Sequence, residues 1–492
     1  MIAWETDDES DFENEILLES YDMFGETMRD LPEFCFLAPK AMMVLRELPD
    51  GQLHTFSWDL GTCVPSEILG SDGWVTHHHP SLRSLSLTTD PYCEETESEI
   101  DLSSLRKLQN LTWRGPRAKD IPALSDAIRG NLPQLQKVGL DLVDWPEIQL
   151  ELTWDSEEDI DEESWFTHTV LGLTSGLPTV AFAAIRDLSL SQVPLGAAMA
   201  HAINFNTLSS LRLRKCPLWD GFLKSAMELK VPIKLKTLEL QYNDDVTQSD
   251  RGDVVVGNFL GVFEGLEDLF LCNPKAESAV VLWHRVVYQQ ATLKRFVHHQ
   301  RLIGSSGISK QDMDFPPDPS MLWPQDYGKD RDTPRVEEDY PQNPLASLKL
   351  EFIGLSCYQE LLESFGLPFM KKVSWKVLHI RRSHTDIVHG VTTSDIYDST
   401  EPASPGRLLR LGTRRFAQWI FGPQGIQSLQ LVVFGDYAHG VQYPENFILC
   451  RNTEEGSEAH FRLVNQGDPE EDVLNQYRDA LEACPTEPLF SM

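Results

Sequence analysis

Three consecutive histidines, His77-His78-His79, are the residues whose type and spacing point most directly to chemistry, because neutral imidazole is a common metal ligand. In an extended chain, adjacent side chains point to opposite faces, so only His77 and His79 can share an ion and a third ligand must come from elsewhere. Pro80, which follows them, cannot continue a helix. We therefore interpret the three histidines as a polar loop between a helix and a strand, and we expect no metal and no cofactor.

The sequence lacks recognisable catalytic motifs. It contains no glycine-rich phosphate loop, no Gly-x-Ser-x-Gly turn and no His-Glu-x-x-His zinc motif. Asp250-Arg-Gly-Asp253 resembles an adhesion tripeptide, but we interpret it as a turn before a helix that starts near Val254. The chain is therefore expected to be non-catalytic. The alternative is an enzyme whose site is assembled between insertions and the open face of a sheet.

The charge of the chain limits the partners that it can bind. Its 492 residues include 76 acidic and 42 basic side chains, which gives a formal net charge of −34 at pH 7. Nucleic acids and anionic lipids attract clustered lysine and arginine, so we expect no nucleic acid and no membrane among the partners. No run of about 18 apolar residues occurs and the start does not resemble a signal peptide, so we expect an intracellular protein, cytoplasmic or nuclear.

The eight cysteines are spread along the chain, and no Cys-x-x-Cys pair occurs. This dispersion is typical of reduced and mostly buried thiols rather than of a disulfide framework or a zinc site. Cysteine chemistry is therefore not expected to carry the function.

A repeat of leucines predicts the elements that position the other residues. Leucine occurs at positions 1, 4 and 6 of five segments, where chance gives about one; they start at Leu82, Leu208, Leu235, Leu266 and Leu345. Similar segments with other apolar residues start at Leu53, Leu108, Leu135, Ile185, Leu293, Trp375 and Ile426. Successive segments start 23 to 31 residues apart, except for three gaps of 50 to 52.

A period of about 27 residues gives room for a strand, a turn and a helix of roughly ten residues. Apolar residues at helical spacing favour helices at 121–128, 222–227, 279–287 and 416–420. Stacking predicts an α/β leucine-rich-repeat solenoid, curved, with a parallel sheet on the concave side, helices on the convex side, and irregular acidic insertions and caps. In the first long gap, alternation at 148–154 predicts one further, divergent strand.

The same pattern predicts the order of regions along the chain. An N-terminal helical cap is expected at 1–48, repeats at 49–303 and an irregular insertion at 304–344. Further repeats at 345–434 contain an insertion near 384–407, and 435–492 is a C-terminal cap with two strands, near 447–449 and 461–464, and a helix at 473–481.

Side chains at positions 3, 5 and 7 of each segment are expected to face the open, concave side of the sheet. The partner-binding residues predicted there are Arg114, Arg212, Arg214, Phe270, Arg295, Lys349, His379 and Arg381. The basic members predict a track for an acidic or phosphorylated peptide. The alternative is a mixed polar face with local ion pairs, such as Arg212 beside Glu239 of the next segment.

Several stretches carry a resemblance to a known family: 56–70, 79–87, 108–115, 433–440 and 483–489. In these the chain resembles fungal leucine-rich-repeat proteins of the F-box or F-box-like kind. The resemblance implies a concave face that recruits a protein client or peptide, and an F-box that binds a Skp1-like adaptor of a ubiquitin ligase. The nearest match to an F-box start, Leu31-Pro-Glu-Phe34, lies too close to the first strand near Leu53 to leave room for an F-box.

Two functions are therefore expected. The first is a non-catalytic substrate-recognition protein of the F-box-like kind, acting for a ubiquitin ligase. The alternative is an interaction scaffold of the same fold with no link to a ubiquitin ligase, because no F-box is visible to bind the adaptor.

Overall fold

The computed structural model describes residues 37–92, 99–154, 160–173, 180–242, 246–273, 279–300, 344–356, 362, 373–381, 411–438, 446–453 and 459–485. They fall into two compact units, the first reaching to Asn131 and the second starting at Leu132. The predicted insertion at 384–407, nearly all of that at 304–344, and most of the predicted N-terminal cap lie outside the described residues.

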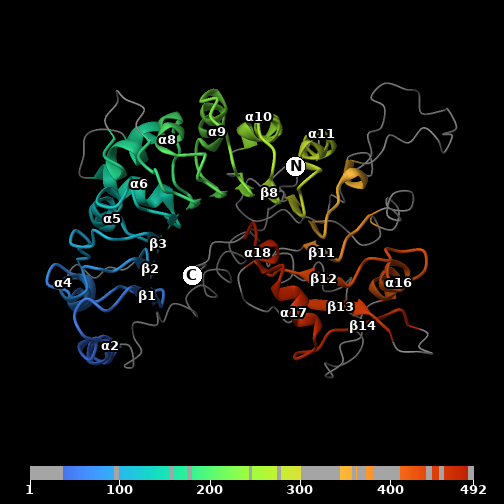
Figure 1. Cartoon of the computed structure of the whole chain (residues 1–492), viewed down its shortest axis with the longest axis horizontal. Helices are drawn as coiled ribbons and strands as arrows, with labels where there is room; N and C mark the ends of the chain where they lie inside the picture. Colours follow the sequence, from blue (N-terminus) through green and yellow to red (C-terminus); the bar gives the residue numbers. More distant parts are fainter. Residues whose placement is uncertain are drawn as a thin grey trace, which may run out of the picture. The chain divides into compact units, whose positions relative to one another are not determined.

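The first unit contains three parallel strands that pair in chain order (Figure 1). They are β1 (Thr55–Asp59), β2 (Ser84–Thr88) and β3 (Asn110–Arg114). The helices described in this unit are α2 (Leu37–Arg46), α3 (Ser66–Leu69), α4 (Trp74–His78) and α5 (Ile121–Arg129). The predicted helix at 121–128 is therefore confirmed.

Buried and partly exposed residues alternate along β2 and β3, as expected for strands with one packed face and one open face. Leu87 of β2 pairs with Trp58 of β1 and Trp113 of β3, and all three side chains are buried. Burying one such leucine stabilises the fold by about 1.5–3 kcal/mol. The leucine spacing predicts these strands because it marks the side chains that are buried on the packed face of the sheet.

The second unit has nine parallel strands among its described residues, followed by two antiparallel ones. The parallel strands are β4 (Lys137–Asp141), β5 (Asp187–Ser191), β6 (Ser210–Arg214), β7 (Thr237–Gln241), β8 (Asp268–Asn273), β9 (Arg295–Gln300), β10 (Phe352–Leu355), β11 (Val377–Arg381) and β12 (Leu431–Gly435). The antiparallel strands are β13 (Phe447–Arg451) and β14 (Phe461–Leu463). The two C-terminal strands that the sequence predicts are therefore confirmed.

The helices described in the second unit lie between its strands in sequence, except for α17 and α18, which follow β14. They are α6 (Trp145–Trp154), α7 (Glu162–Trp165), α8 (Ala197–Ala202), α9 (Trp219–Glu228), α10 (Val246–Leu260), α11 (Ala279–Val286), α16 (Leu411–Ile420), α17 (Glu470–Asn475) and α18 (Arg478–Leu481). Figure 1 shows α8, α9, α10 and α11 side by side on one side of the strands. In each unit, the side of the strands that faces away from the helices is called the inner face below. Parallel strands with helices on the other side confirm the α/β architecture.

Two predictions about local structure are wrong. The segment 148–154 lies in α6, and β4 pairs directly with β5, so no strand lies between them. Asp144 accepts a hydrogen bond from the backbone of Glu147 and begins this helix. Asp250-Arg-Gly-Asp253 lies inside α10 rather than in a turn. Gly252 serves close packing there, because a Cβ at this position would lie 2.9 Å from the Tyr242 ring.

The alignment of β10 and β12 also differs from the prediction. Ile353 and Leu355 pair with positions 4 and 6 of the β9 segment. The β10 segment therefore starts at Leu350 rather than at Leu345. The β12 segment starts at Leu429 rather than at Ile426. Both strands are buried on both faces, so apolar residues occupy nearly every position and several alignments of the leucine pattern fit equally well.

The cysteines that the structure describes follow the expectation, except for Cys63. The described free thiols, which are all buried, belong to Cys216, Cys272, Cys450 and Cys484. Cys63 is disulfide-bonded, which corrects the expectation of reduced thiols at this residue. Spacing along the sequence could not reveal it, because a disulfide requires proximity in space. Within the described parts of the chain, no helix has the length and apolar character needed to cross a membrane.

Candidate functional site

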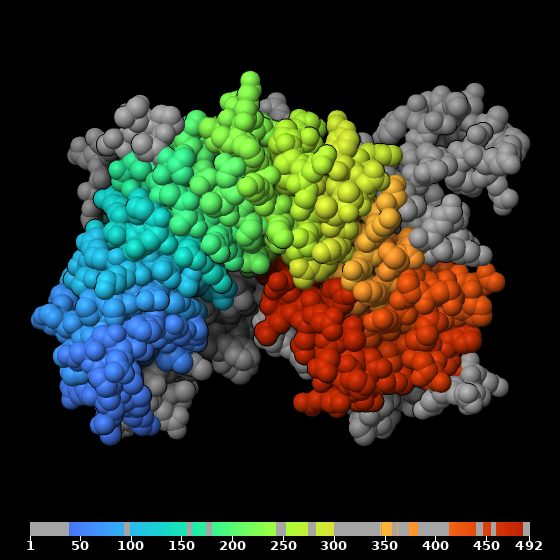
Figure 2. All heavy atoms as spheres, in the orientation of Figure 1, coloured from blue at the N-terminus to red at the C-terminus, as the bar shows by residue number. Residues whose placement is uncertain are grey.

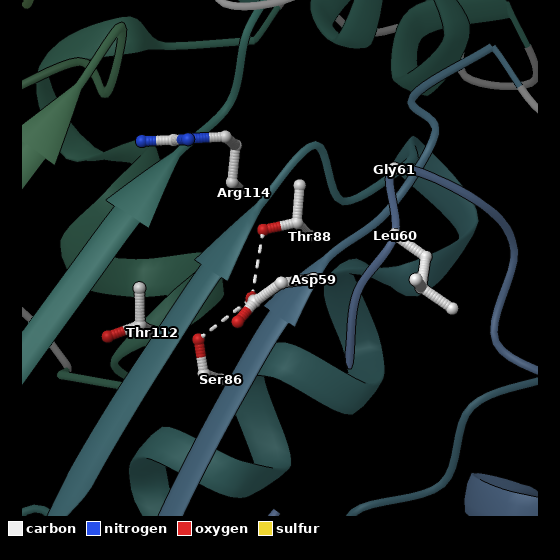
Figure 3. A pocket seen from close by; sticks show the side chains of 7 residues that line it. All are labelled: Asp59, Leu60, Gly61, Ser86, Thr88, Thr112 and Arg114. Carbon is white, nitrogen blue, oxygen red and sulfur yellow. Dashed lines mark hydrogen bonds between the residues drawn. The ribbon is translucent and has the colours of Figure 1, made fainter. Parts of the chain in front are cut away.

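The inner face of the first unit carries a polar pocket (Figure 3). Its cavity has a volume of about 480 Å³. It is lined by Asp59, Leu60, Gly61, Ser86, Thr88, Thr112 and Arg114, which come from β1, the turn after it, β2 and β3. Polar side chains therefore occupy the inner positions of three neighbouring strands and leave the face open.

The Asp59 carboxylate is held in place by three hydroxyl groups. Ser86 and Thr88 each donate a hydrogen bond of 3.2 Å to its Oδ1 atom, as Figure 3 shows. Ser57, two residues earlier on the same strand, donates to Oδ2. Hydroxyl donors orient the carboxylate without neutralising it, and among the described residues no basic side chain forms an ion pair with Asp59.

The inner face of the second unit is covered from β7 to β12 by a late segment of the chain, whereas inner residues of β5 and β6 are partly exposed. We call residues 470–485, which contain α17 and α18, the C-terminal segment. It packs against apolar residues on the inner face, and together they form a buried cluster: Phe270, Cys272, Val297, Phe352, Val377, Leu431, Val433, Cys450, Leu474, Tyr477, Ala480, Leu481, Ala483 and Cys484. Figure 2 shows red atoms of this end of the chain against yellow atoms of the same unit.

Arg381 is the main polar anchor of the C-terminal segment. Its side chain is 3% exposed, and its Nη2 atom donates to the backbone carbonyls of Ala483 and Cys484 at 2.5 and 3.3 Å. Its Nη1 atom donates to the Ala480 carbonyl at 3.4 Å, and Nε donates to His299 Nδ1 at 3.2 Å. One buried guanidinium thus satisfies several carbonyls that end a short helix.

Glu239 anchors the same segment from β7. Its Oε1 atom accepts a 2.8 Å hydrogen bond from the backbone N–H of Cys484. Burial raises the pKa of this carboxyl, but attraction and hydrogen bonding from Arg214 outweigh burial and hold the pKa below its ordinary value. Burial also raises the pKa of the Cys484 thiol well above its ordinary value, so this thiol is neutral. The anchor is an ionised carboxylate beside a neutral thiol.

The predicted basic track consists largely of ion pairs. Arg214 binds Glu239 through two hydrogen bonds of 2.7 and 3.1 Å, and Arg212 lies 3.6 Å from the same carboxylate. Arg295 pairs with Asp268 in the same two-bonded way. The alternative interpretation, a mixed polar face with local pairs such as Arg212 beside Glu239, is confirmed for these residues.

The other predicted binding residues lie in three different settings. Phe270, His379 and Arg381 are buried, which leaves them inaccessible to a partner in this structure. Lys349 is exposed but precedes β10, so it does not occupy an inner position of a strand. Arg114 lines the polar pocket of the first unit. The structure therefore does not bring the predicted set together as one surface.

The three histidines serve separate local roles. His77 lies 3.6 Å from Asp72, and His78 lies 2.9 Å from Asp50. The ring of His79 is buried, and burial lowers its pKa. His77 and His78 lie in the last turn of α4, which corrects the expectation that all three histidines form a loop, whereas the predicted helix end shortly before Pro80 is confirmed. Across the described ranges, no three His, Cys, Asp or Glu side chains are grouped as a metal site.

Sequence reasoning missed Asp59 and the C-terminal segment. Asp59 occupies position 7 of the first apolar segment, so reading that segment like the others would have found it. The covering of the second unit had a signal as well. Phe270, Val297 and Val377 are apolar residues at inner positions, and runs of apolar residues on both faces are typical of strands that are covered on both sides.

No protein-family model matches the chain, and no curated protein matches it.

Proposed function

We propose that this chain is a non-catalytic protein-binding repeat protein whose client docks on the inner face of its first unit. The observation that supports the proposal most is the open polar pocket, in which Asp59 is oriented by hydroxyls and forms no ion pair with any of the basic residues that the structure describes. In the second unit the inner residues from β8 to β12 are engaged with the C-terminal segment. An accessible, oriented and incompletely paired polar group is what a protein partner recognises.

The proposal is tested by filling the pocket. Thr112→Trp places a large ring among the residues that line the pocket. Lys224→Trp adds the same ring at an exposed position of α9 in the second unit. Both variants are compared with the wild type in quantitative capture of clients from an extract of the source cells. We expect that wild type and Lys224→Trp capture the clients equally and that Thr112→Trp does not capture them. Equal capture by all three chains would overturn the proposal.

The resemblance to F-box-like proteins adds a finer proposal, that the client is presented to a ubiquitin ligase. The alternative is a scaffold with no ligase link. Co-purification decides between them, because a substrate-recognition protein must bring a Skp1-like adaptor with it. Stoichiometric adaptor on wild type and on Thr112→Trp would support the ligase link. Client without adaptor would support the scaffold.

A further inference from the structure

Asp59 differs from Glu239 and Asp268, two other carboxylates at inner strand positions. In the second unit, Glu239 and Asp268 each have an arginine within hydrogen-bonding distance. Asp59 has three neutral hydroxyl donors instead, and its carboxylate is exposed. A cation that would complete this arrangement is therefore missing from the described part of the chain.

Arg114 lines the same pocket but does not supply that cation. Figure 3 shows its guanidinium directed away from the Asp59 carboxylate, from the far strand β3. Ser86 and Thr88 lie between them on β2 and donate to Asp59. The pocket thus has an anionic end whose hydrogen-bonding geometry is already fixed before any partner arrives.

A partner that covers this pocket removes water from Asp59. An ionised carboxylate under a protein partner must be paired, because the hydroxyls alone do not balance its charge. A carboxylate has about four acceptor positions and three donors are present, so one position remains for a donor from outside. The group that meets both requirements is a charged N–H donor.

We infer that the pocket receives a lysine or arginine side chain of the client, which pairs with Asp59. This inference rests on the proposed function, because it names the chemistry by which the same site recognises its partner. The strongly negative chain favours approach of a basic segment, and the hydroxyl-oriented carboxylate makes the contact local and directional. A client with a neutral residue at this position would leave Asp59 covered and unpaired.

The test uses arrays of random-sequence decapeptides, each sequence printed with lysine, arginine, norleucine or glutamate at its centre. Purified wild type, Asp59→Asn, Asp59→Glu and Thr112→Trp are applied at two salt concentrations. For the peptides that wild type binds, we expect the lysine and arginine forms to bind at least about tenfold more tightly than the norleucine form. Asp59→Asn should abolish this preference, and Asp59→Glu, which keeps the charge, should retain it.

Two outcomes separate failure of the inference from failure of the proposed function. The inference is overturned in either of two cases: wild type shows no preference for basic centres, or the preference survives in Asp59→Asn. If Thr112→Trp still loses binding in these cases, the pocket remains the client site. If Thr112→Trp binds the same peptides as wild type, the proposed function is overturned. Thermal unfolding of the Asp59 variants, compared with wild type, checks that the loss is not due to unfolding.

Discussion

In the first unit the inner positions of β1 and β2 hold Asp59, Ser86 and Thr88, whereas in the second unit the inner positions of β10 and β12 hold Phe352 and Val433. The helix-side positions are mostly leucines or other large apolar residues in both units, with His298 of β9 as an exception. One repeat pattern therefore builds a packed outer layer everywhere, while the inner residues decide whether the face stays open or becomes core. The four experiments below test this contrast.

The largest effect is expected for Arg381→Met. The substitution keeps the unbranched part of the side chain but removes the guanidinium, which leaves the carbonyls of Ala480 and Ala483 without their donor. Each buried acceptor left without a donor costs about 1–3 kcal/mol, so loss of both bonds should lower the free energy of unfolding by about 2–6 kcal/mol. Urea unfolding should show this loss, and hydrogen exchange should show faster exchange in residues 470–485. Lys224→Met, which breaks an exposed pair with Asp220, is the control and should cost less than about 0.5 kcal/mol.

Acid should weaken the second unit through His298. Burial lowers the pKa of His298 to about 4, whereas an unfolded histidine has a pKa of about 6.5. As pH falls below 6.5 the unfolded chain takes up the proton first, so stability is complete above 6.5 and falls by about 3 kcal/mol by pH 4.

The variant His298→Asn keeps an acceptor for the indole N–H of Trp283, which donates to His298 Nδ1 at 3.0 Å. Because asparagine takes up no proton in this range, the free energy of unfolding of the variant should fall less steeply between pH 7 and pH 4. Parallel curves for the two chains, measured by urea titration at each pH, would contradict the assignment of this acid sensitivity to His298.

Leu481→Ala should cost about 2–3 kcal/mol, because it leaves a cavity between the C-terminal segment and the inner face of the second unit. The control is Leu150→Ala on α6, which removes the same atoms from a side chain that is 52% exposed. Denaturant midpoints compare the two. Equal, small losses would show that the C-terminal segment covers the face without contributing to the core.

The smallest effect is expected in the open face. Thr88→Val removes one of the three hydroxyls on Asp59 at nearly constant volume, and the cost to stability should be about 0.5 kcal/mol because the site is solvated. Binding of lysine-centred peptides should weaken by about threefold, since the carboxylate loses part of its orientation. Isothermal titration and thermal unfolding measure the two quantities. A larger loss of stability than of binding would make Asp59 a structural residue.

The strands of the first unit and β5 to β9 could be predicted from the sequence because leucine spacing reports burial on one face, a local property. Ser86 and Thr112 could be placed on the inner face for the same reason. The register of β10 and β12 could not, because strands that are apolar on both faces contain several equivalent alignments. The ion pair of Arg214 could not be predicted either. The sequence predicted Arg214 as a partner-binding residue, but its side chain is bound to Glu239.

The docking of the C-terminal segment could not be predicted, because no local pattern links residues so far apart. The predicted helix at 473–481 is present only as two short helices, α17 and α18. The break falls at Gln476 and Tyr477, whereas Arg381 binds carbonyls farther along the chain, those of Ala480 and Ala483.

The hydrogen bond between Glu239 and Cys484 joins residues 245 positions apart, which sets an order of events during synthesis. At about 5–20 residues per second, a ribosome needs roughly 10–50 s after making Glu239 to deliver its partner. Until then the apolar inner side chains of β8 to β12 lack the cover that residues 470–485 provide. The core of the second unit is therefore completed only late in the synthesis of the chain.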